Sequence, residues 1–399
     1  MLPFLRLMLL LAPLGPAADL NLKTVDPTGA GMDRERLSRI PSVMRKFVED
    51  GKAAGIVTLV VRHGRVAEFS ATGFQDLDKR TPMRTDSIFR IASMTKPVSS
   101  VAVIMLMEQG KLALIDPVEK YLPEFRGQKQ KATCPPGSTE SSCVIKPPHA
   151  VTVWNLLTHT SGVGGPKEAT KPRTLAERVL GIAQLPLEFE PGTQWRYRTE
   201  GIDILGRIVE VVSGMPFDRF VQENIFTPLG MVDSSFYPLT EKLYRIATVY
   251  TESGGKLGQA ADSRDTLYPS PGGGMLSTAA DMARFYQMML NKGVLNGRKI
   301  ISSDSVALMT MNHVGNLQAG FAAGMGFGLG WGVVRDPKGA FRLCSVGSYG
   351  HGGAFRTYGW VDPPKDMVRV IMLQRTNGGG DVADEINAFL AMAAAAINQ

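Results

Sequence analysis

The chain has 399 residues, of which 44% are hydrophobic and 20% charged, and its 44 Lys and Arg against 37 Asp and Glu give a net charge of +7. This hydrophobic content excludes an intrinsically disordered chain, and the lack of any short repeat excludes collagen and coiled coil. The net charge is spread along the chain, and clusters such as Lys129, Lys131 and Lys146 favour a solvated surface over a nucleic-acid-binding stripe.

The first eighteen residues have the features of a secretory signal peptide. Arg6 supplies a positive charge, Leu7–Leu14 an apolar stretch, and Gly15–Ala18 the small residues that signal peptidase prefers. Cleavage before Asp19 would leave 43 basic against 37 acidic residues, a charge of +6. We expect an exported protein, periplasmic or secreted, without a membrane anchor. An unstructured N-terminal tail is the alternative.

The next segments predict a helix followed by a β-hairpin. Met32–Asp50 has a helical pattern, and Pro41 is expected to bend or split that helix. Ile56–Val61 is a β-branched run, residues 62–64 form a turn, and Arg65–Thr72 is the returning strand.

A similar strand pair precedes the C-terminus. Thr357–Val361 and Met367–Gln374 predict two strands around a Pro-rich turn, and an Ala-rich helix follows at Asp384–Ile397. Between the two ends of the chain, amphipathic stretches such as Leu175–Leu185 and Gly201–Ser213 predict helices.

Strands at both ends and helices between them predict an α/β (α+β) architecture with two parts. Residues 19–112 and 272–399 would form one sheet domain built from both termini. Residues 113–271 would form a mainly helical domain inserted into it.

The three cysteines are too few for a disulfide scaffold. Cys134 and Cys143 bracket a polar, turn-rich loop whose ends could meet, and an oxidising compartment would favour a disulfide there. Cys344 is then left over and is expected to be a small buried residue. The five histidines are scattered without metal-ligand spacing, so the sequence does not support a metal site.

One short segment, residues 89–97, has the composition of a nucleophile with its base. Ser93 precedes the apolar-periodic run Val98–Gln109, and Lys96 follows one helical turn later on the same face. A serine needs a base within hydrogen-bond reach, and a buried lysine with a lowered pKa can serve. The plain alternatives are a helix N-cap and a surface cation. A second match to this pattern, Ser253–Lys256, is not accompanied by a helical pattern and is expected to be a loop.

The segment resembles the serine–x–x–lysine motif of the β-lactamase and penicillin-binding superfamily. Further stretches resemble that family's landmarks and occur in the family's order from about residue 30 onward: Leu156–Gly162, Pro191–Thr193, Pro228–Met231 and Gly273–Ala279. The resemblance is closest to the class C β-lactamases and to the esterases that share their fold, the family VIII carboxylesterases. It implies a β-lactamase-like fold, with an antiparallel sheet flanked by helices and an inserted helical domain. It also implies a serine hydrolase that uses no cofactor.

Tyr197 stands where the family keeps a tyrosine. The resemblance implies that its phenol, with a pKa lowered by the Lys96 ammonium, accepts the Ser93 proton and later passes it to the leaving group. The family pattern is Tyr-x-Asn, whereas the third position here is Thr199. Thr199 lacks the amide that would hold a lactam's acylamino group, so efficient lactam turnover is in doubt. A core aromatic is the alternative for Tyr197.

His351 aligns with the lysine of the family's Lys-Thr/Ser-Gly triplet. Gly352 and Gly353 would let substrate come close, and the backbone N–H groups of Ser93 and Ala354 would form the oxyanion hole. A histidine grips a penicillin carboxylate less firmly than a lysine does and tolerates an uncharged ester better. The alternative is that His351 only orients the tyrosine.

Some neighbouring residues have two interpretations. Arg356 is either a substitute cation or an exposed arginine at a strand end. Four aromatic residues either line an acyl pocket or belong to the core: Trp331, Phe355, Tyr358 and Trp360.

The sequence therefore predicts an exported serine esterase that hydrolyses small acyl esters through a Ser93 acyl-enzyme, with slow β-lactam hydrolysis as a side activity. A β-lactamase or D-alanyl-D-alanine carboxypeptidase and an acyltransferase are alternatives with the same chemistry. A penicillin-recognising binding protein without turnover is the alternative from another class. The expected partner is a small-molecule ester or β-lactam, with no nucleic acid. Neither a Gly-x-Ser-x-Gly elbow nor a His-Glu-x-x-His motif occurs.

Overall fold

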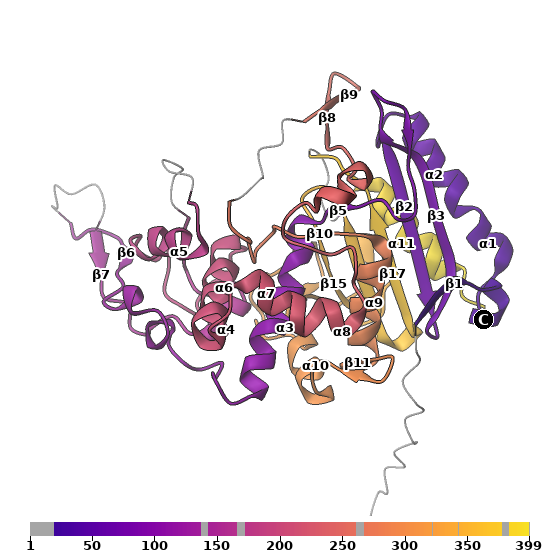
Figure 1. Cartoon of the computed structure of the whole chain (residues 1–399). Coiled ribbons are helices and arrows are strands. Elements are labelled where there is room, and N and C mark those ends of the chain that lie inside the picture. Colours follow the sequence, from indigo (N-terminus) through magenta and orange to yellow (C-terminus); the bar gives the residue numbers. More distant parts are fainter. Residues whose placement is uncertain are drawn as a thin grey trace, which may run out of the picture.

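A computed structural model gives the architecture of the chain (Figure 1). It describes residues 20–136, 143–165, 172–260, 267–320, 322–341, 343–376 and 383–398. The predicted signal peptide, residues 1–18, and the interior of the cysteine-bracketed loop, residues 137–142, lie outside the described residues.

A nine-stranded sheet forms the centre of the described chain, in the order β1-β3-β2-β17-β16-β15-β14-β13, with β4 paired to β3. Its strands are β1 (Asn21–Thr24), β2 (Gly55–Arg62), β3 (Arg65–Asp76), β4 (Thr81–Pro82), β13 (Met325–Phe327), β14 (Gly332–Val334), β15 (Tyr349–Gly352), β16 (Tyr358–Asp362) and β17 (Met367–Met372). The predicted N-terminal hairpin is confirmed as β2–β3 and the C-terminal strand pair as β16–β17. Pairing of β17 with β2 joins the two ends of the chain in one sheet.

The sheet is mixed rather than wholly antiparallel, which corrects one detail of the expectation. The edge strand β1 pairs with β3 in parallel, whereas the other ladders of the sheet are antiparallel. A parallel pair needs a long crossover connection. The helices between β1 and β2 supply that length.

Alternation along the strands sends apolar side chains to two separate cores. In β2, Val57 and Leu59 face one core while Ile56 and Val60 face the other. Helix α9 (Ala279–Leu290) covers the first face, and α2 (Ile40–Glu49) and α11 (Asp384–Ala395) cover the second (Figure 1). The helix predicted over Met32–Asp50 is split as expected, into α1 (Arg34–Ser38) and α2, with Pro41 in the first turn of α2.

The segment between the two sheet-forming parts is largely helical, and its centre is one packed helix pair. Helix α3 (Thr95–Glu108), which is buried along most of its length, packs against α6 (Thr199–Ser213). The neighbouring helices are α4 (Val153–Leu157), α5 (Leu175–Ala183), α7 (Phe217–Val221), α8 (Thr227–Leu229) and α10 (Ser303–Thr310). The helices predicted at 175–185 and 201–213 are confirmed as α5 and α6. Domain boundaries at 112 and 271 stay a prediction.

Short two-stranded ribbons complete the fold. They are β5–β10 (Phe89–Arg90 and Leu276–Ser277), β6–β7 (Gln130–Ala132 and Cys143–Ile145), β8–β9 (Tyr250–Ser253 and Lys256–Gln259) and β11–β12 (Val294–Leu295 and Arg298–Lys299). A disulfide joins Cys134 to Cys143 beside the β6–β7 ribbon. The second serine–x–x–lysine match, Ser253–Lys256, forms the turn of the β8–β9 hairpin and stands on no helix.

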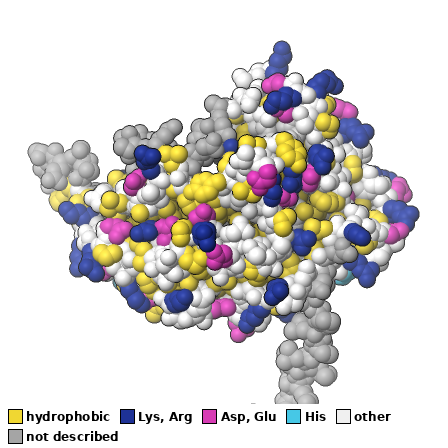
Figure 2. Space-filling view, viewed as in Figure 1, with side chains coloured by type: hydrophobic (Ala, Val, Ile, Leu, Met, Phe, Trp, Pro, Cys, Tyr) yellow, Lys and Arg dark blue, Asp and Glu magenta, His cyan; other side chains and the backbone are white. Residues whose placement is uncertain are grey.

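On the face shown in Figure 2, the described Lys and Arg side chains are interspersed with Asp and Glu and form no continuous basic stripe. This matches the spread of charge along the sequence. No helix in the described ranges is long and apolar enough to cross a membrane.

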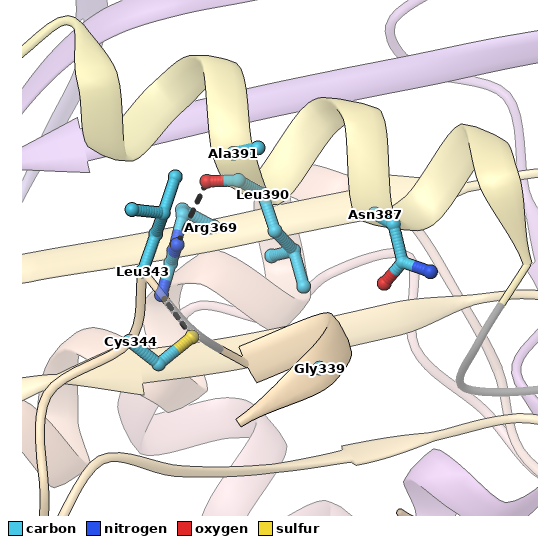
Figure 3. A pocket seen from close by; sticks show the side chains of 7 residues that line it. All are labelled: Gly339, Leu343, Cys344, Arg369, Asn387, Leu390 and Ala391. Atoms are coloured by element: carbon cyan, nitrogen blue, oxygen red, sulfur yellow. Dashed lines mark hydrogen bonds between the residues drawn. The ribbon is translucent and has the colours of Figure 1, made fainter. Parts of the chain in front are cut away.

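A cavity of about 230 Å³ lies under α11, on the side of the sheet away from α3 and α9 (Figure 3). At its wall, the fully buried Arg369 donates to the carbonyl of Leu390 at 3.0 Å and to Cys344 Sγ at 3.3 Å. The leftover cysteine is therefore buried, as expected, and it also accepts a hydrogen bond.

Candidate active site

Ser93 lies in a 3₁₀ turn, η2 (Ala92–Met94), between β5 and the first turn of α3. The residue before it, Ala92, has a φ of +45°, a region that residues with a Cβ rarely adopt. Thr95 fixes this turn, because its Oγ1 donates to the Ala92 carbonyl at 2.6 Å and accepts the Met275 N–H at 3.2 Å. The turn thus holds the half-buried Ser93 at the start of a helix, where the sequence predicted it.

Lys96 is fully buried one turn further on, and its Nζ points back to the serine. Nζ donates to Ser93 Oγ at 2.9 Å and to the carbonyl of Gly272 at 2.5 Å. A third, longer hydrogen bond of 3.3 Å runs to Thr199 Oγ1. Ser93 and Thr199, two predicted site residues more than a hundred positions apart, therefore meet at one amine because α3 and α6 begin side by side.

The protonation of Lys96 is set by two opposing effects. Burial lowers its pKa to about 7, and the nearby carboxylates of Asp203 and Glu200 oppose that shift. Asp203 is 1% exposed, accepts the Gly272 N–H at 3.2 Å and pairs with Arg178 at 3.3 Å. Burial raises the pKa of Asp203 to about 6, against the pull of Arg178 and Lys96. Asp203 thus holds Gly272, the residue whose carbonyl accepts from Lys96, and its carboxylate stabilises the charged form of that amine.

Tyr197 lies two residues before the start of α6, with its half-buried ring beside the same amine. Lys96 Nζ is 4.8 Å from the centre of the Tyr197 ring, in a cation–π arrangement. Lys96 Nζ is therefore the atom that brings Ser93, Thr199 and Tyr197 together.

Neutral aromatic rings surround the other side of Tyr197. Its ring centre lies 4.6 Å from that of His159, 5.9 Å from that of His351 and 6.4 Å from that of Trp195. Phe327 packs behind them, 5.0 Å from His159 and 5.6 Å from Trp195. Burial and the Lys96 charge place the pKa of His159 well below its ordinary value.

His351 lies on β15, which packs against the turn that carries the serine. Its Nδ1 is 2.7 Å from the carbonyl of Gly352, so Nδ1 carries the proton and donates. Burial and the Lys96 charge lower the pKa of His351 to about 3, so the ring is neutral at pH 7. A Cβ on Gly353 would come within 2.3 Å of the Ile91 carbonyl and 2.2 Å of Thr357 Oγ1, so only glycine allows this close approach.

Ala354 follows in an exposed turn.

Arg356 fits neither of its two predicted roles, a substitute cation for substrate or an exposed arginine at a strand end. Arg356 is 7% exposed and forms a buried ion pair with Glu385 of α11. It is therefore neither an exposed strand-end arginine nor a cation free for substrate, because a distant helix supplies its carboxylate. The four aromatic residues with two interpretations all belong to the buried core: Trp331, Phe355, Tyr358 and Trp360.

Within the described ranges, no group of three or more His, Cys, Asp or Glu side chains is placed to hold a metal ion. Two of the histidines, His159 and His351, flank Tyr197 as described above. Two others contact residues elsewhere in the fold, His63 with Asp366 at 2.7 Å and His313 with the indole of Trp154 at 3.3 Å.

A family model described as Beta-lactamase matches residues 40–393 of the chain. The chain belongs to the β-lactamase family. The expected resemblance and the β-lactamase-like fold are thereby confirmed.

Individual relatives of this β-lactamase-family protein include an esterase and a penicillin-binding protein. It is 30% identical to Esterase EstB of Burkholderia gladioli, over 85% of this chain and 91% of the esterase. It is 32% identical to Penicillin-binding protein 4 of Amycolatopsis lactamdurans, over 74% of this chain and 73% of that protein. The solved structure of EstCE1, a hydrolase with promiscuous acyltransferase activity, matches with a TM-score of 0.76 and 24% identity, covering 92% of this chain and 99% of that one. The protein is a serine hydrolase with the β-lactamase fold.

Two residues of this β-lactamase-family site, Asp203 and His159, were missed as candidates by sequence reasoning. Asp203 had a visible signal, since it is an acidic residue between Ile202 and Ile204 in a helix whose neighbouring positions are apolar. His159 had a weaker signal, its place inside the landmark Leu156–Gly162, and nothing local connects it to Tyr197.

Proposed function

We propose that this protein is an exported serine esterase that hydrolyses small acyl esters through an acyl-enzyme on Ser93. One contact carries the proposal, the 2.9 Å hydrogen bond between the buried Lys96 Nζ and Ser93 Oγ. Because the pKa of Lys96 is lowered to about 7, a large part of the amine is neutral at physiological pH and can accept the serine proton. A serine with such a base beside it is an activated nucleophile.

In the proposed first step, Ser93 Oγ attacks the ester carbonyl while its proton passes to Lys96, directly or through the Tyr197 phenol. The two groups titrate as a coupled pair, so the base is the pair. The backbone N–H groups of Ser93 and Ala354 stabilise the oxyanion. The alcohol leaves with the proton. Water then attacks the acyl-enzyme with the same pair as its base, the acyl–Oγ bond breaks, the carboxylic acid leaves and the proton returns to Ser93 Oγ.

The charges around Tyr197 favour an uncharged substrate. His351 is neutral at pH 7 because its pKa is about 3. Arg356 is paired with Glu385, and Arg198 donates to Glu188 at 2.7 and 2.9 Å. A substrate carboxylate would therefore compete with protein carboxylates for these cations, whereas a neutral ester needs no counter-charge.

A β-lactamase or D-alanyl-D-alanine carboxypeptidase uses the same chemistry, and the similarity to a penicillin-binding protein favours it. Against it, Thr199 offers no amide and His351 no charge to a lactam substrate. An acyltransferase would differ only in the acceptor, since an alcohol would replace water at the acyl-enzyme.

A direct comparison of substrates tests the proposal. We expect rapid turnover of a short-chain p-nitrophenyl ester and slow or transient acylation by a chromogenic cephalosporin, followed by intact mass. Faster turnover of the cephalosporin would instead identify a β-lactamase. A persistent lactam adduct without ester turnover would identify a penicillin-recognising binding protein.

Ser93→Ala should abolish ester turnover, with a loss of at least about 10⁴-fold in kcat, because it removes the nucleophile. Ser100→Ala is the matched control, since this buried serine lies on α3, the helix directly after the turn that carries Ser93, and the described chain gives its Oγ no hydrogen-bond partner. The control should keep full activity, and both variants should keep the wild-type Tm. Retained turnover in Ser93→Ala would refute the assignment.

Export is a separate part of the proposal. It is supported by the signal-peptide pattern of residues 1–18 and by the disulfide between Cys134 and Cys143, a bond that persists in oxidising compartments. Mass spectrometry of protein secreted by an expression host should give a mature N-terminus at Asp19. Full-length protein retained in the cytoplasm would contradict export.

A further inference from the structure

We propose that His159 is a positioning residue that fixes the Tyr197 phenol beside Lys96. His159 lies in the buried loop after α4, whereas Tyr197 lies just before α6. The two residues are far apart in the sequence and are brought together by the packing of these helices. The inference rests on the proposed function, because it assigns His159 a role in activating the same serine.

The backbone on both sides of Tyr197 is tied to His159. The N–H of Arg196 donates to the His159 carbonyl at 2.9 Å. The N–H of Arg198 donates to His159 Nδ1 at 3.3 Å. One residue thus accepts hydrogen bonds from the residues before and after Tyr197. The Arg198 N–H belongs to the peptide that directly follows Tyr197, and the Arg196 N–H restrains the chain one peptide before it.

The His159 ring supports the tyrosine ring itself. The two ring centres are 4.6 Å apart with a tilt of 52°, and Phe327 packs on His159 at 5.0 Å. His159 is 2% exposed, so its ring has little room to move. Backbone and side chain of His159 therefore restrain the same phenol.

The loop that carries His159 is itself fixed. His159 has a φ of +58°, a left-handed conformation that His and Asn adopt more readily than most residues. Thr158 Oγ1 and Thr160 Oγ1 are hydrogen-bonded at 2.8 Å, and the Thr160 N–H donates to the carbonyl of Asn155 at 2.9 Å. The hydrogen bonds of Thr158 and Thr160 therefore hold His159 in this left-handed conformation.

Of the two ring nitrogens of His159, only Nδ1 has a hydrogen-bond partner among the described residues. An amide N–H can only donate, so Nδ1 holds a lone pair and the proton of the neutral ring lies on Nε2. Nε2 is buried and has no hydrogen-bond partner in the described part of the chain. A phenylalanine would remove this unsatisfied Nε2 donor, but it would leave the Arg198 N–H without its acceptor. The acceptor at Nδ1 is therefore what a histidine adds here.

Two matched variants separate the acceptor from the ring. His159→Phe keeps the ring and removes the acceptor, whereas His159→Asn keeps an acceptor at the δ position and tolerates the positive φ. For ester hydrolysis we expect His159→Phe to lose about 10- to 100-fold in kcat, the effect of a small misplacement of a catalytic group. Its KM should stay within about threefold, and the acidic limb of its pH–rate profile should shift. His159→Asn should recover most of the kcat.

A second readout keeps this test separate from the identity of the substrate. The rate at which a fluorophosphonate probe labels Ser93, followed by intact mass, reports activation of the serine without use of an ester substrate. A wild-type protein that is not labelled would overturn the proposed nucleophile. A labelled wild type with an equally fast His159→Phe variant would overturn the role of His159.

The remaining outcomes are also decisive. A lower Tm in His159→Phe with unchanged kcat, pH profile and labelling rate would mean that His159 only packs. If His159→Phe does not fold, His159→Gln takes its place, because its acceptor lies one bond further from the backbone. His159→Gln should then be slower than His159→Asn at equal Tm, and equal rates would overturn the inference.

Discussion

The two sides of the candidate site differ in polarity. On one side, Lys96 is surrounded by polar acceptors, with the carboxylates of Asp203 and Glu200 close enough to raise its pKa. On the other side, Tyr197 is lined by rings that carry no charge at pH 7, among them His159 and His351.

This difference indicates how a buried amine can stay poised between charged and neutral forms. Burial away from water destabilises an ammonium, and buried carboxylates stabilise it. A second cation on the tyrosine side would lower the Lys96 pKa further, and a third carboxylate would keep the amine charged. The neutral side therefore supplies desolvation, and the polar side limits its effect so that the pKa remains near 7.

The largest effect is expected when the Lys96 amine itself is removed. Lys96→Met keeps the length and apolar volume of the side chain and removes the base. We expect kcat/KM for a p-nitrophenyl ester to fall about 10³-fold, because Ser93 then has only the Tyr197 phenol to receive its proton. Steady-state kinetics with a matched Tm measurement check this. Activity within tenfold of wild type would show that Lys96 is not part of the base.

Local patterns were enough to predict the elements that carry the site. Ser93 at a helix start, Lys96 one turn later and the strand pairs near both ends all follow from short-range periodicity, and the structure has them. The split of the first helix follows from Pro41 alone.

The partners of these residues could not be predicted, because tertiary packing chooses them. Asp203 acts through Gly272, which lies 69 positions away, and His159 acts through the Arg198 amide, 39 positions away. The buried pair of Arg356 with Glu385 and the parallel edge strand β1 have the same origin, since neither leaves a local pattern.

An intermediate effect is expected when the polar side loses one charge. Asp203→Asn keeps an oxygen that can accept the Gly272 N–H and removes the carboxylate that raises the Lys96 pKa. The pKa of Lys96 should therefore fall below 7, and the neutral amine should form at lower pH. We expect the acidic limb of the kcat/KM profile to move to lower pH by about one pH unit.

Glu200→Gln is the comparison for Asp203→Asn. The Glu200 carboxylate also raises the Lys96 pKa, but by less than Asp203 does. The acidic limb of the Glu200→Gln profile should therefore move to lower pH by a smaller amount. The profile is measured between pH 5 and 9 with an uncharged ester, so that the substrate does not titrate. A limb that stays in place or moves to higher pH in Asp203→Asn would break the proposed balance.

The smallest effect is expected from the longest bond to the amine. Thr199→Val keeps the methyl group that packs near Gly272 and removes the hydroxyl, which accepts from Lys96 Nζ at 3.3 Å. Loss of one neutral acceptor is worth about 1 kcal/mol, or about fivefold in kcat/KM. The position of the acidic limb should hardly change, because no charge is removed. If Thr199→Val instead lost as much activity as Lys96→Met, the hydroxyl would be passing the proton between Lys96 and the reacting atoms, and the polar side would act as a relay rather than a charge balance.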